Sequence, residues 1–194
     1  MTRDELVGPP DEVARRLLGA RLVAGDVVVR LVDLEAYGGA DDAASHAFRG
    51  ETARNRSMFG RPGLLYVYLS YGVHSCANIV CAPEGQASAV LVRGVEVLAG
   101  EATVTARRPR GPRKGRLDGP GRVCQGLGLD RTLDGVDLLA LGSPVLLEPG
   151  TPSEGESVVA GPRIGISKEA DRPWRFRLAP ADATGRGDGH QGLR

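Results

Sequence analysis

The feature that most constrains the fold is a pair of strand-like segments joined by a tight turn. Residues 64–71 and 74–81 both have the composition of strands, and they meet at Tyr71-Gly72-Val73. Gly72 supplies a turn backbone that most other residues adopt only with strain. Strands joined by so short a turn pair antiparallel. The sequence therefore predicts a β-hairpin within a sheet dominated by antiparallel neighbours.

A further strand is predicted over residues 27–37. Because side chains alternate along a strand, Asp33, Glu35 and Tyr37 share one face. The apolar residues assigned to the opposite face are Val28, Val32, Leu34 and Ala36. We expect this strand to bury its apolar face and to offer acidic and aromatic side chains on the other.

Aromatic residues make up only 4% of the chain, so their concentration around these strands needs a physical reason. Tyr66, Tyr68 and Tyr71 lie in the hairpin, and the fourth tyrosine, Tyr37, lies two residues after Glu35. A pocket that stacks a flat ring and holds a carboxylate beside it explains both observations.

The remaining segments predict short helices and more strands. Residues 11–18 are predicted to be helical, with Asp11 as N-cap and Gly19 as the stop signal. The other predicted helical segments are 54–59, 100–108 and 121–127, and the other predicted strands are 87–98, 145–147, 163–167 and 174–178.

The layout predicts a mixed α/β (α+β) fold in a single domain. We expect a mainly antiparallel, curved sheet with short flanking helices and a protruding β-hairpin. The domain is expected to span residues 1–179. Residues 180–194 are rich in Gly, Ala and Asp and are expected to form a disordered C-terminal tail.

Composition excludes several classes of protein. No apolar run approaches the length of a membrane span, and the N-terminus lacks a signal-peptide core. Cys76, Cys81 and Cys124 lack the spacing of a disulfide framework, which favours a reducing compartment. Cys76 and Cys81 with His74 lack a fourth metal ligand at usual spacing. We therefore expect a cytoplasmic monomer that needs no metal or other cofactor.

Positive charge is concentrated in one stretch, although the net charge is only +1. The basic residues of this stretch are Arg107, Arg108, Arg110, Arg113, Lys114 and Arg116. Such a run forms either a solvated loop or an electrostatic contact to a polyanion, and the sequence leaves both open.

Eleven short motifs occur in a distinctive order. They are Leu34-Glu35-Ala36-Tyr37, Asp41-Asp42-Ala43-Ala44-Ser45-His46, Arg54-Asn55-Arg56-Ser57-Met58-Phe59, Pro62-Gly63, Tyr66-Val67-Tyr68, Tyr71-Gly72, Asn78-Ile79, Leu91-Val92-Arg93, Gly119-Pro120-Gly121, Cys124-Gln125 and Arg163-Ile164-Gly165-Ile166. Each is weak alone. In this order and spacing, from about residue 14 to residue 178, the chain resembles the alkyladenine (3-methyladenine) DNA glycosylase family, the mammalian type without a helix-hairpin-helix.

The resemblance implies a DNA glycosylase that starts base-excision repair on the bacterial nucleoid. Its substrates would be alkylated purines such as 3-methyladenine and 7-methylguanine, with hypoxanthine and ethenoadenine as further candidates. Glu35 would be the general base that activates water, and Arg93 would help to hold that water. A carboxylate suits an oxocarbenium-like transition state because it stabilises the developing charge. The only lysines, Lys114 and Lys168, lie away from the motifs, so a Schiff-base lyase step is not expected.

The resemblance also implies how a damaged base would be held. Tyr37 and Tyr68 would sandwich the flipped base, and His46 would form another wall. Asn78 would form the floor of the pocket and disfavour the amino group of guanine. Tyr71 would enter the duplex from the minor groove and fill the gap left by the flipped nucleotide.

The expected partner is double-stranded DNA that contains damaged purines. The residues expected to contact its backbone are Arg54, Arg108, Arg110, Arg113, Gly119 and Gly121. Gly119-Pro120-Gly121 precedes a predicted helix, so it either presents backbone amides to a phosphate or forms only a turn.

Without the resemblance, simpler interpretations apply to single residues. Glu35 could be a salt-bridge partner, Tyr37 and Tyr68 ordinary sheet tyrosines, His46 a surface histidine and Asn78 an amide that satisfies backbone groups. At the level of the whole chain, the alternatives are a non-catalytic lesion-binding protein and an RNA-binding module. The presence of both Glu35 and Arg93 disfavours the first, and an aromatic residue at a hairpin tip disfavours the second.

Overall fold

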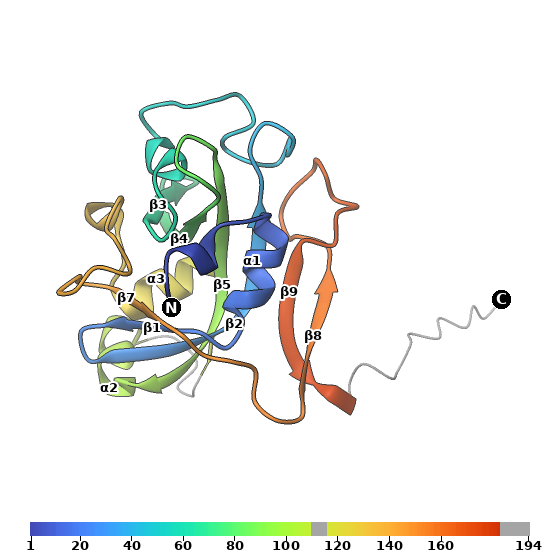
Figure 1. Ribbon diagram of the computed structural model, residues 1–194. Helices are drawn as coiled ribbons and strands as arrows, with labels where there is room; N and C mark the ends of the chain where they lie inside the picture. The colour runs from blue at the N-terminus through green and yellow to red at the C-terminus, as the bar shows by residue number, and fades with distance from the viewer. Residues whose placement is uncertain (110–115, 183–194) are drawn as a thin grey trace.

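An antiparallel sheet built around one central strand organises the fold (Figure 1). In the computed structural model, which describes residues 1–109 and 116–182, the main path of this sheet runs β3-β4-β5-β2-β1-β7. Its strands are β1 (Arg21–Ala24), β2 (Val27–Tyr37), β3 (Leu65–Ser70), β4 (His74–Cys81), β5 (Ser88–Ala99) and β7 (Leu146–Glu148). Every ladder among the described residues is antiparallel, which confirms the expected α+β class with a curved, mainly antiparallel sheet.

β2 is central because it is paired along both edges. One edge pairs with β5 over almost its whole length. The other edge pairs first with β1 and then, at residues 33–35, with β9 (Arg175–Pro180). β9 also pairs with β8 (Glu156–Gly161), and the two form a ribbon beside the rest of the sheet (Figure 1). The end of β2 that carries Glu35 is thus enclosed from two sides.

The ladder between β2 and β5 shifts register twice near the middle of β2. At one shift β2 has an extra residue, Val32, and at the next β5 has an extra residue, Arg93. An extra residue reverses the alternation of side chains. Leu31 before the bulge and Leu34 after it consequently belong to the same buried cluster. The expectation that Val28 shares a face with Leu34 is therefore wrong, since Val28 lies half-buried on the opposite side of the strand.

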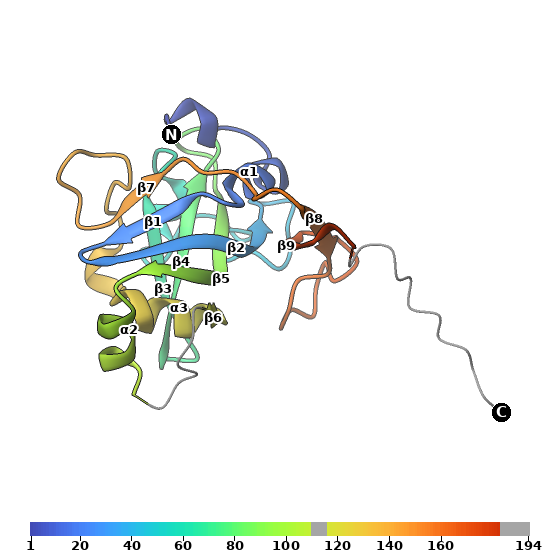
Figure 2. The same cartoon turned by 90° about the horizontal axis from the view of Figure 1, so that it is seen from below.

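Three short α-helices flank the sheet: α1 (Pro10–Leu17), α2 (Glu101–Arg107) and α3 (Pro120–Leu127) (Figure 2). α1 packs on β2, and α3 packs on β4. Asp11 is not the N-cap of α1, because the helix already begins at Pro10. Proline suits this first position because its fixed φ is helical and its missing N–H would have no intrahelical partner. Asp11 instead lies in the first turn, where a negative charge interacts well with the helix dipole.

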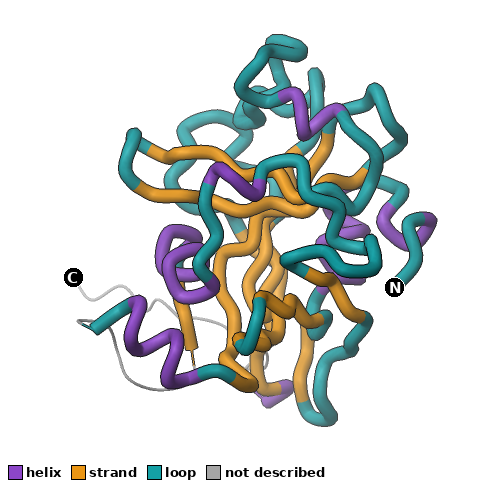
Figure 3. The backbone as a smooth tube through the Cα atoms, turned by 90° about the vertical axis from the view of Figure 1, so that its left-hand side faces the viewer, coloured by secondary structure: helices purple, strands orange, loops and turns teal. Residues whose placement is uncertain are grey.

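Short 3₁₀ helices and loops complete the chain. The 3₁₀ helices are η1 (Asp4–Leu6), η2 (Arg56–Phe59) and η3 (Arg131–Leu133). Loops account for much of one end of the molecule (Figure 3). None of the helices in the described part of the chain has the length and apolar character needed to cross a bilayer.

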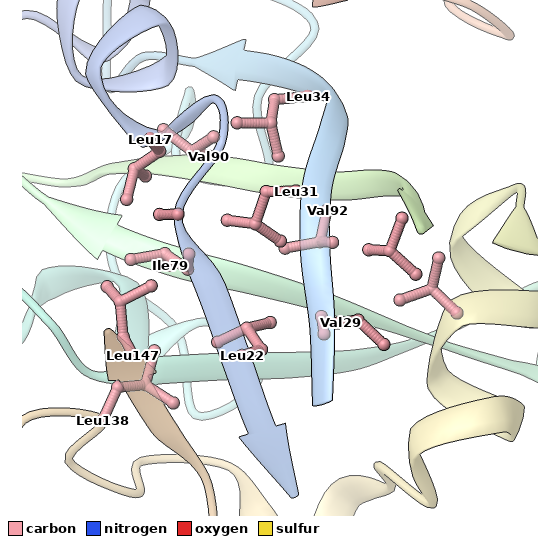
Figure 4. Close-up of a cluster of buried hydrophobic side chains, with 14 of the residues drawn as sticks. Leu17, Leu22, Val29, Leu31, Leu34, Ile79, Val90, Val92, Leu138 and Leu147 are labelled. Carbon is pink, nitrogen blue, oxygen red and sulfur yellow. The ribbon is translucent and has the colours of Figure 1, made fainter. Parts of the chain in front are cut away.

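The main core is formed by the strands of the sheet together with α1, α2 and α3, and Figure 4 shows part of it. Its labelled members in Figure 4 are Leu17, Leu22, Val29, Leu31, Leu34, Ile79, Val90, Val92, Leu138 and Leu147. They come from α1, β1, β2, β4, β5, β7 and the segment before β7. This core fixes the strands whose other sides and ends form the candidate site.

Two segments differ from the expectation drawn from the sequence. Residues 163–167 form an irregular loop, and the strand in this region is β8, earlier in the chain. The Ile164 amide donates to the Glu35 carboxylate, so it is not available to a sheet ladder. Residues 116–118, expected in a basic loop, form the short strand β6, which pairs with β5 and buries Leu117. Most of that loop, at residues 110–115, and most of the expected tail, at residues 183–194, lie outside the described residues.

The core interpretation predicts unequal costs for two leucine truncations on paired strands. Leu31→Ala should lower the free energy of unfolding by about 2–5 kcal/mol, because it leaves a cavity in a close-packed interior. Leu98→Ala should change it by at most about 0.5 kcal/mol, since Leu98 is 53% exposed on β5. Urea unfolding followed by circular dichroism measures both values, and equal losses would contradict this placement of the core.

Candidate active site

A cavity of about 510 Å³ lies between the end of β2, the β3–β4 hairpin and the loop that follows β8. All the residues that the sequence assigned to catalysis or to a base pocket line it, together with Arg54 and Tyr71: Glu35, Tyr37, His46, Tyr68, Asn78 and Arg93. These residues are far apart in the chain. The pairing of β5 with both β2 and β4 brings them together.

Glu35 is fully buried, although the alternation of β2 predicted an open face at this position. Its Oε1 accepts a hydrogen bond from the Ile164 amide at 2.8 Å, and its Oε2 accepts one from the Tyr37 hydroxyl at 3.0 Å. The Arg93 guanidinium lies 3.5 Å from Oε1. Burial raises the pKa of Glu35 above its ordinary value, whereas the Ile164 amide, Arg93 and Tyr37 stabilise the carboxylate and oppose the rise. A carboxylate in this setting is a stronger base than one in water.

Arg93 reaches the same point from the neighbouring strand. As the extra residue of a bulge on β5, it is not held to that strand's alternation, and bulges often re-aim a side chain beside an active site. Its carbonyl oxygen accepts a hydrogen bond from the Gly119 amide at 2.8 Å, which ties the start of α3 to β5. Arg93 also borders a second cleft of about 540 Å³. The charged residues lining this cleft are Asp33, Arg93, Arg116, Asp118, Arg122, Arg175 and Arg177, so arginines outnumber acids.

Tyrosine and histidine rings form the walls of the cavity. The ring centroids of His46 and Tyr68 are 4.4 Å apart with planes at 82°, and those of Tyr66 and Tyr68 are 5.7 Å apart at 31°. His46 Nδ1 lies 3.1 Å from the Tyr66 hydroxyl. Burial, followed by the charge of Arg54, lowers the pKa of His46, so the imidazole is neutral at pH 7. Burial raises the pKa of Tyr66 to about 12 and also raises those of Tyr37 and Tyr68. The walls are therefore uncharged rings at neutral pH.

Asn78 lies on β4 opposite Tyr66 and is 4% exposed. Its Nδ2 donates to the carbonyl oxygen of Tyr66 at 3.0 Å and to that of Cys76 at 3.4 Å. The side-chain nitrogen of Asn78 therefore satisfies backbone carbonyl groups, as the simpler interpretation expects. The same two bonds hold the side chain rigidly against the cavity that it lines.

The hairpin tip presents an aromatic side chain to solvent. Tyr71 is 95% exposed and Val73 is 71% exposed. The turn has φ values of 50° at Tyr71 and 73° at Gly72, and positive φ at both central residues is typical of type I′ hairpin turns. Below the tip, Arg54 donates to the Leu69 carbonyl at 3.1 Å and thereby braces β3. A tyrosine held out in this way has little to contact within its own domain.

Gly119-Pro120-Gly121 lies at the start of α3, and the structure bears on both of its interpretations, as a donor of backbone amides to a phosphate and as a turn. The Gly119 amide is already bonded to Arg93, and proline has no amide hydrogen. Gly121 lies in the first helical turn, where amides have no intrahelical acceptor, so of these three residues it is the one able to donate to an anion. Gly121 also permits close packing, because a Cβ there would lie 3.1 Å from the Cβ of His74.

Arg108, the first basic residue after α2, does not line the cavity. Arg108 is half-buried, and its Nε donates to Gln125 Oε1 at 3.3 Å, so it joins α2 to α3. Arg110 and Arg113 lie outside the described residues.

Sequence reasoning assigned no role to three residues of the site. Tyr66 lies two residues before Tyr68 on the same predicted strand, so the alternation of side chains places both rings on one face and gives a weak indication that Tyr66 belongs to the site. Arg163 and Ile164 belong to one of the motifs, but nothing local connects them to Glu35. Their place in the site depends on the loop between β8 and β9 folding back over β2.

Comparison with known proteins gives a consistent result. Residues 4–181 match the family model described as methylpurine-DNA glycosylase. A protein of Nocardia farcinica named "Putative 3-methyladenine DNA glycosylase" is 47% identical over 186 residues, which is 93% of this chain and 88% of the relative. A protein of Cutibacterium acnes with the same name is 45% identical over 184 residues, 93% of this chain and 96% of the relative.

The site geometry predicts unequal losses of stability for two tyrosines of one hairpin. Tyr71→Ser should change the free energy of unfolding by at most about 0.5 kcal/mol, because this ring contributes nothing to the core. Tyr66→Ser should lower it by about 3–5 kcal/mol, since Tyr66 is 1% exposed. Urea unfolding measures both. A large loss for the Tyr71 variant would mean that its ring packs within the domain.

Proposed function

The chain belongs to the methylpurine-DNA glycosylase family, and on this premise we propose that it hydrolyses the bond between deoxyribose and alkylated purines in duplex DNA. Family membership makes it a 3-methyladenine DNA glycosylase. The observation that carries the finer proposal is the position of Glu35. A buried carboxylate with three donors around it borders a cavity of neutral aromatic rings, and an exposed tyrosine stands at the tip of the adjoining hairpin.

In the proposed mechanism, the damaged nucleotide leaves the base stack before any bond is broken. An N-glycosidic bond is out of reach inside a duplex, so the enzyme must extrude the nucleotide. Tyr71 enters the space that the base vacates, and its contact with the neighbouring bases offsets part of the cost of unstacking. The exposure of its ring supports this role, because no rearrangement of the domain is needed to bring it to the DNA.

The extruded base then stacks between Tyr37 and Tyr68, with His46 at its side. Alkylation at N3 or N7 makes a purine cationic, and electron-rich aromatic faces attract a cation as well as a flat ring. Uncharged walls support this assignment, since a cationic imidazole would repel such a base. Asn78 would meet the edge of the purine and exclude the amino group of guanine.

Hydrolysis follows once a water molecule lies between Glu35 and the sugar. Glu35 takes a proton from this water, and Arg93 helps to position it. The water oxygen bonds to C1′ as the bond from C1′ to the purine nitrogen breaks. The base departs as a good leaving group because alkylation has already made it positive. The carboxylate also stabilises the oxocarbenium character of the sugar in the transition state. Within the described ranges 1–109 and 116–182, no lysine lines the cavity, which supports hydrolysis without a Schiff-base step.

Contacts to the DNA backbone are assigned to the basic rim of the cavity. Arg54 stands at its mouth, and the Gly121 amide at the start of α3 is suited to a phosphate. The arginine-rich cleft beside Arg93 extends this surface. Arg108, with Arg110 and Arg113, remains a candidate for a more distant phosphate contact. A local basic surface of this kind gives salt-dependent binding while the net charge stays near zero.

The direct test is release of free base. Duplexes that each carry a single 3-methyladenine, 7-methylguanine, hypoxanthine or ethenoadenine are incubated with excess protein, and free base is measured by chromatography. We expect release from at least the alkylated substrates. Tight binding to lesion duplexes without release would favour a non-catalytic lesion-binding protein, and preference for RNA would favour an RNA-binding module.

Glu35→Gln should lower the single-turnover rate of base release by about 10²–10⁴-fold, because an amide cannot accept the proton of water. Lesion binding should persist. In the wild type, release should fall with decreasing pH as Glu35 is protonated, at a pH above the ordinary pKa of glutamate, since burial raises the pKa of this group. Glu96→Gln, on the paired strand β5, is the matched control and should keep the wild-type rate. Near-normal release by Glu35→Gln would remove Glu35 from the mechanism.

Asn78→Ser should raise release of guanine-derived bases relative to hypoxanthine. The smaller side chain leaves room for the exocyclic amino group, and discrimination by one steric contact amounts to about 1–3 kcal/mol. The ratio of single-turnover rates on 7-methylguanine, mismatched guanine and hypoxanthine measures this effect. An unchanged or lower ratio would show that Asn78 does not guard the pocket.

A further inference from the structure

None of the steps proposed above uses Arg163, a buried arginine beside the cavity. The side chains of Arg163 and Asp42 have no exposed surface. Arg163 donates to Asp42 through NH1 at 2.6 Å and through NH2 at 2.9 Å, a two-point arrangement that only arginine can make. NH1 also donates to the Ala36 carbonyl at 3.0 Å, and among the described residues Nε has no hydrogen-bond partner. Burial of a charge pair is costly, so a contribution to stability alone is a weak reason for this one.

The ion pair fixes the loop that follows β2. Besides Arg163, Asp42 accepts hydrogen bonds from the Gly38 amide at 2.9 Å and from the Ala44 amide at 3.1 Å. Ala44 and His46 line the cavity. Arg163 therefore anchors, through Asp42, a segment that carries part of the aromatic wall.

The same guanidinium lies against the ring of Tyr37. Its central carbon is 4.7 Å from the Tyr37 ring centroid and 5.3 Å from that of Trp174. Arg172 lies 4.6 Å from the Trp174 ring and extends the stack outward. A planar cation held by Asp42 at its edge keeps the tyrosine ring from turning away from the cavity.

The backbone provides a second connection. Ile164, the next residue, donates its amide to Glu35 Oε1 at 2.8 Å. Tyr37, whose ring Arg163 contacts, donates its hydroxyl to Oε2 of the same carboxylate at 3.0 Å. Two donors of the Glu35 carboxylate thus depend on where Arg163 is held.

We propose that Arg163 is a positioning residue that orients the Tyr37 ring and, through the backbone of Ile164, the Glu35 carboxylate. This inference rests on the proposed function, because it assigns a role within that reaction. It explains why the loop between β8 and β9 is attached to the loop after β2 by a buried ion pair.

The proposal has a consequence for pH dependence that a purely structural role lacks. Hydrogen bonds to an ionised carboxylate lower its pKa, so misplacement of the Ile164 amide and the Tyr37 hydroxyl should raise the pKa of Glu35. In a plot of the rate of base release against pH, the acidic limb, where the rate falls as Glu35 is protonated, should then move to higher pH. The titratable and charged groups that face Glu35 are Asp33 and Tyr37 on β2, Tyr68 on β3, Arg93 on β5 and Arg175 on β9. Arg163→Lys changes the identity of none of them.

The test compares Arg163→Lys with Arg30→Lys. Arg30 also makes a two-point ion pair, with the two carboxylate oxygens of Glu156 at 2.7 and 2.8 Å, and it sits on β2 and does not line the cavity. Both variants keep the charge and lose the forked geometry. Single-turnover release of ethenoadenine or 3-methyladenine is measured from pH 4 to pH 9, with the melting temperature of each protein. We expect Arg163→Lys to be slower by about 10–100-fold, with its acidic limb shifted upward, and Arg30→Lys to keep the wild-type rate and limb.

A second variant keeps the proposal testable if Arg163→Lys does not fold. Ile164→Pro removes the amide hydrogen that the Glu35 carboxylate accepts and also fixes φ at this position. The side chain that it replaces is 47% exposed, so the core is untouched. It should shift the acidic limb in the same direction. Wild-type rate and limb in folded Arg163→Lys, or an unshifted limb in Ile164→Pro, would overturn the inference. Absence of base release from wild type and Arg30→Lys alike would instead overturn the proposed function.

Discussion

The burial of one carboxylate on the central strand is the constraint on which the rest of the site depends. Glu35 has no exposed surface, and an ionised carboxylate in that position needs hydrogen-bond donors and positive charge around it. Arg93 comes from β5, the Ile164 amide from the loop before β9, and the Tyr37 hydroxyl from two residues further along β2. The strand order β5-β2-β9 around this point is the arrangement that supplies all three. The topology of the sheet thus determines which groups surround the Glu35 carboxylate.

The fold separates a cavity with uncharged aromatic walls from a basic surface beside it. The cavity walls are rings that carry no charge at neutral pH, whereas the arginines line an adjacent cleft and the rim. Arg93 borders both spaces. An antiparallel sheet makes a rigid platform for such a site, because its side chains are fixed by packing on the opposite face. The hairpin tip with Tyr71 is the part that extends beyond this platform.

Local patterns predicted a large part of this structure, and contacts across the chain decided the rest. β2 has the bounds expected from its alternation, and the turn at Gly72 lies where a positive φ was required. The order of the motifs identified the family, and the residues it implicated in catalysis and base binding line one cavity, although their roles stay predictions. The sequence around Val32 and Arg93 does not predict the bulges there, since a bulge depends on how β2 and β5 pair with each other. Residues 163–167 have the composition of a strand, but the hydrogen bond of the Ile164 amide to a distant carboxylate made them a loop.

The account is tested most directly by measuring the pKa of Glu35 itself. Carboxyl ¹³C NMR titration of the folded protein, with Glu35→Gln to assign the resonance, gives this value without reference to any substrate. The structure predicts an inflection above the ordinary pKa of glutamate, because burial outweighs the three donors. The same inflection should mark the acidic limb of base release. A carboxyl group that titrates at or below the ordinary value, or a rate profile that does not follow it, would contradict the assignment of Glu35 as a buried base.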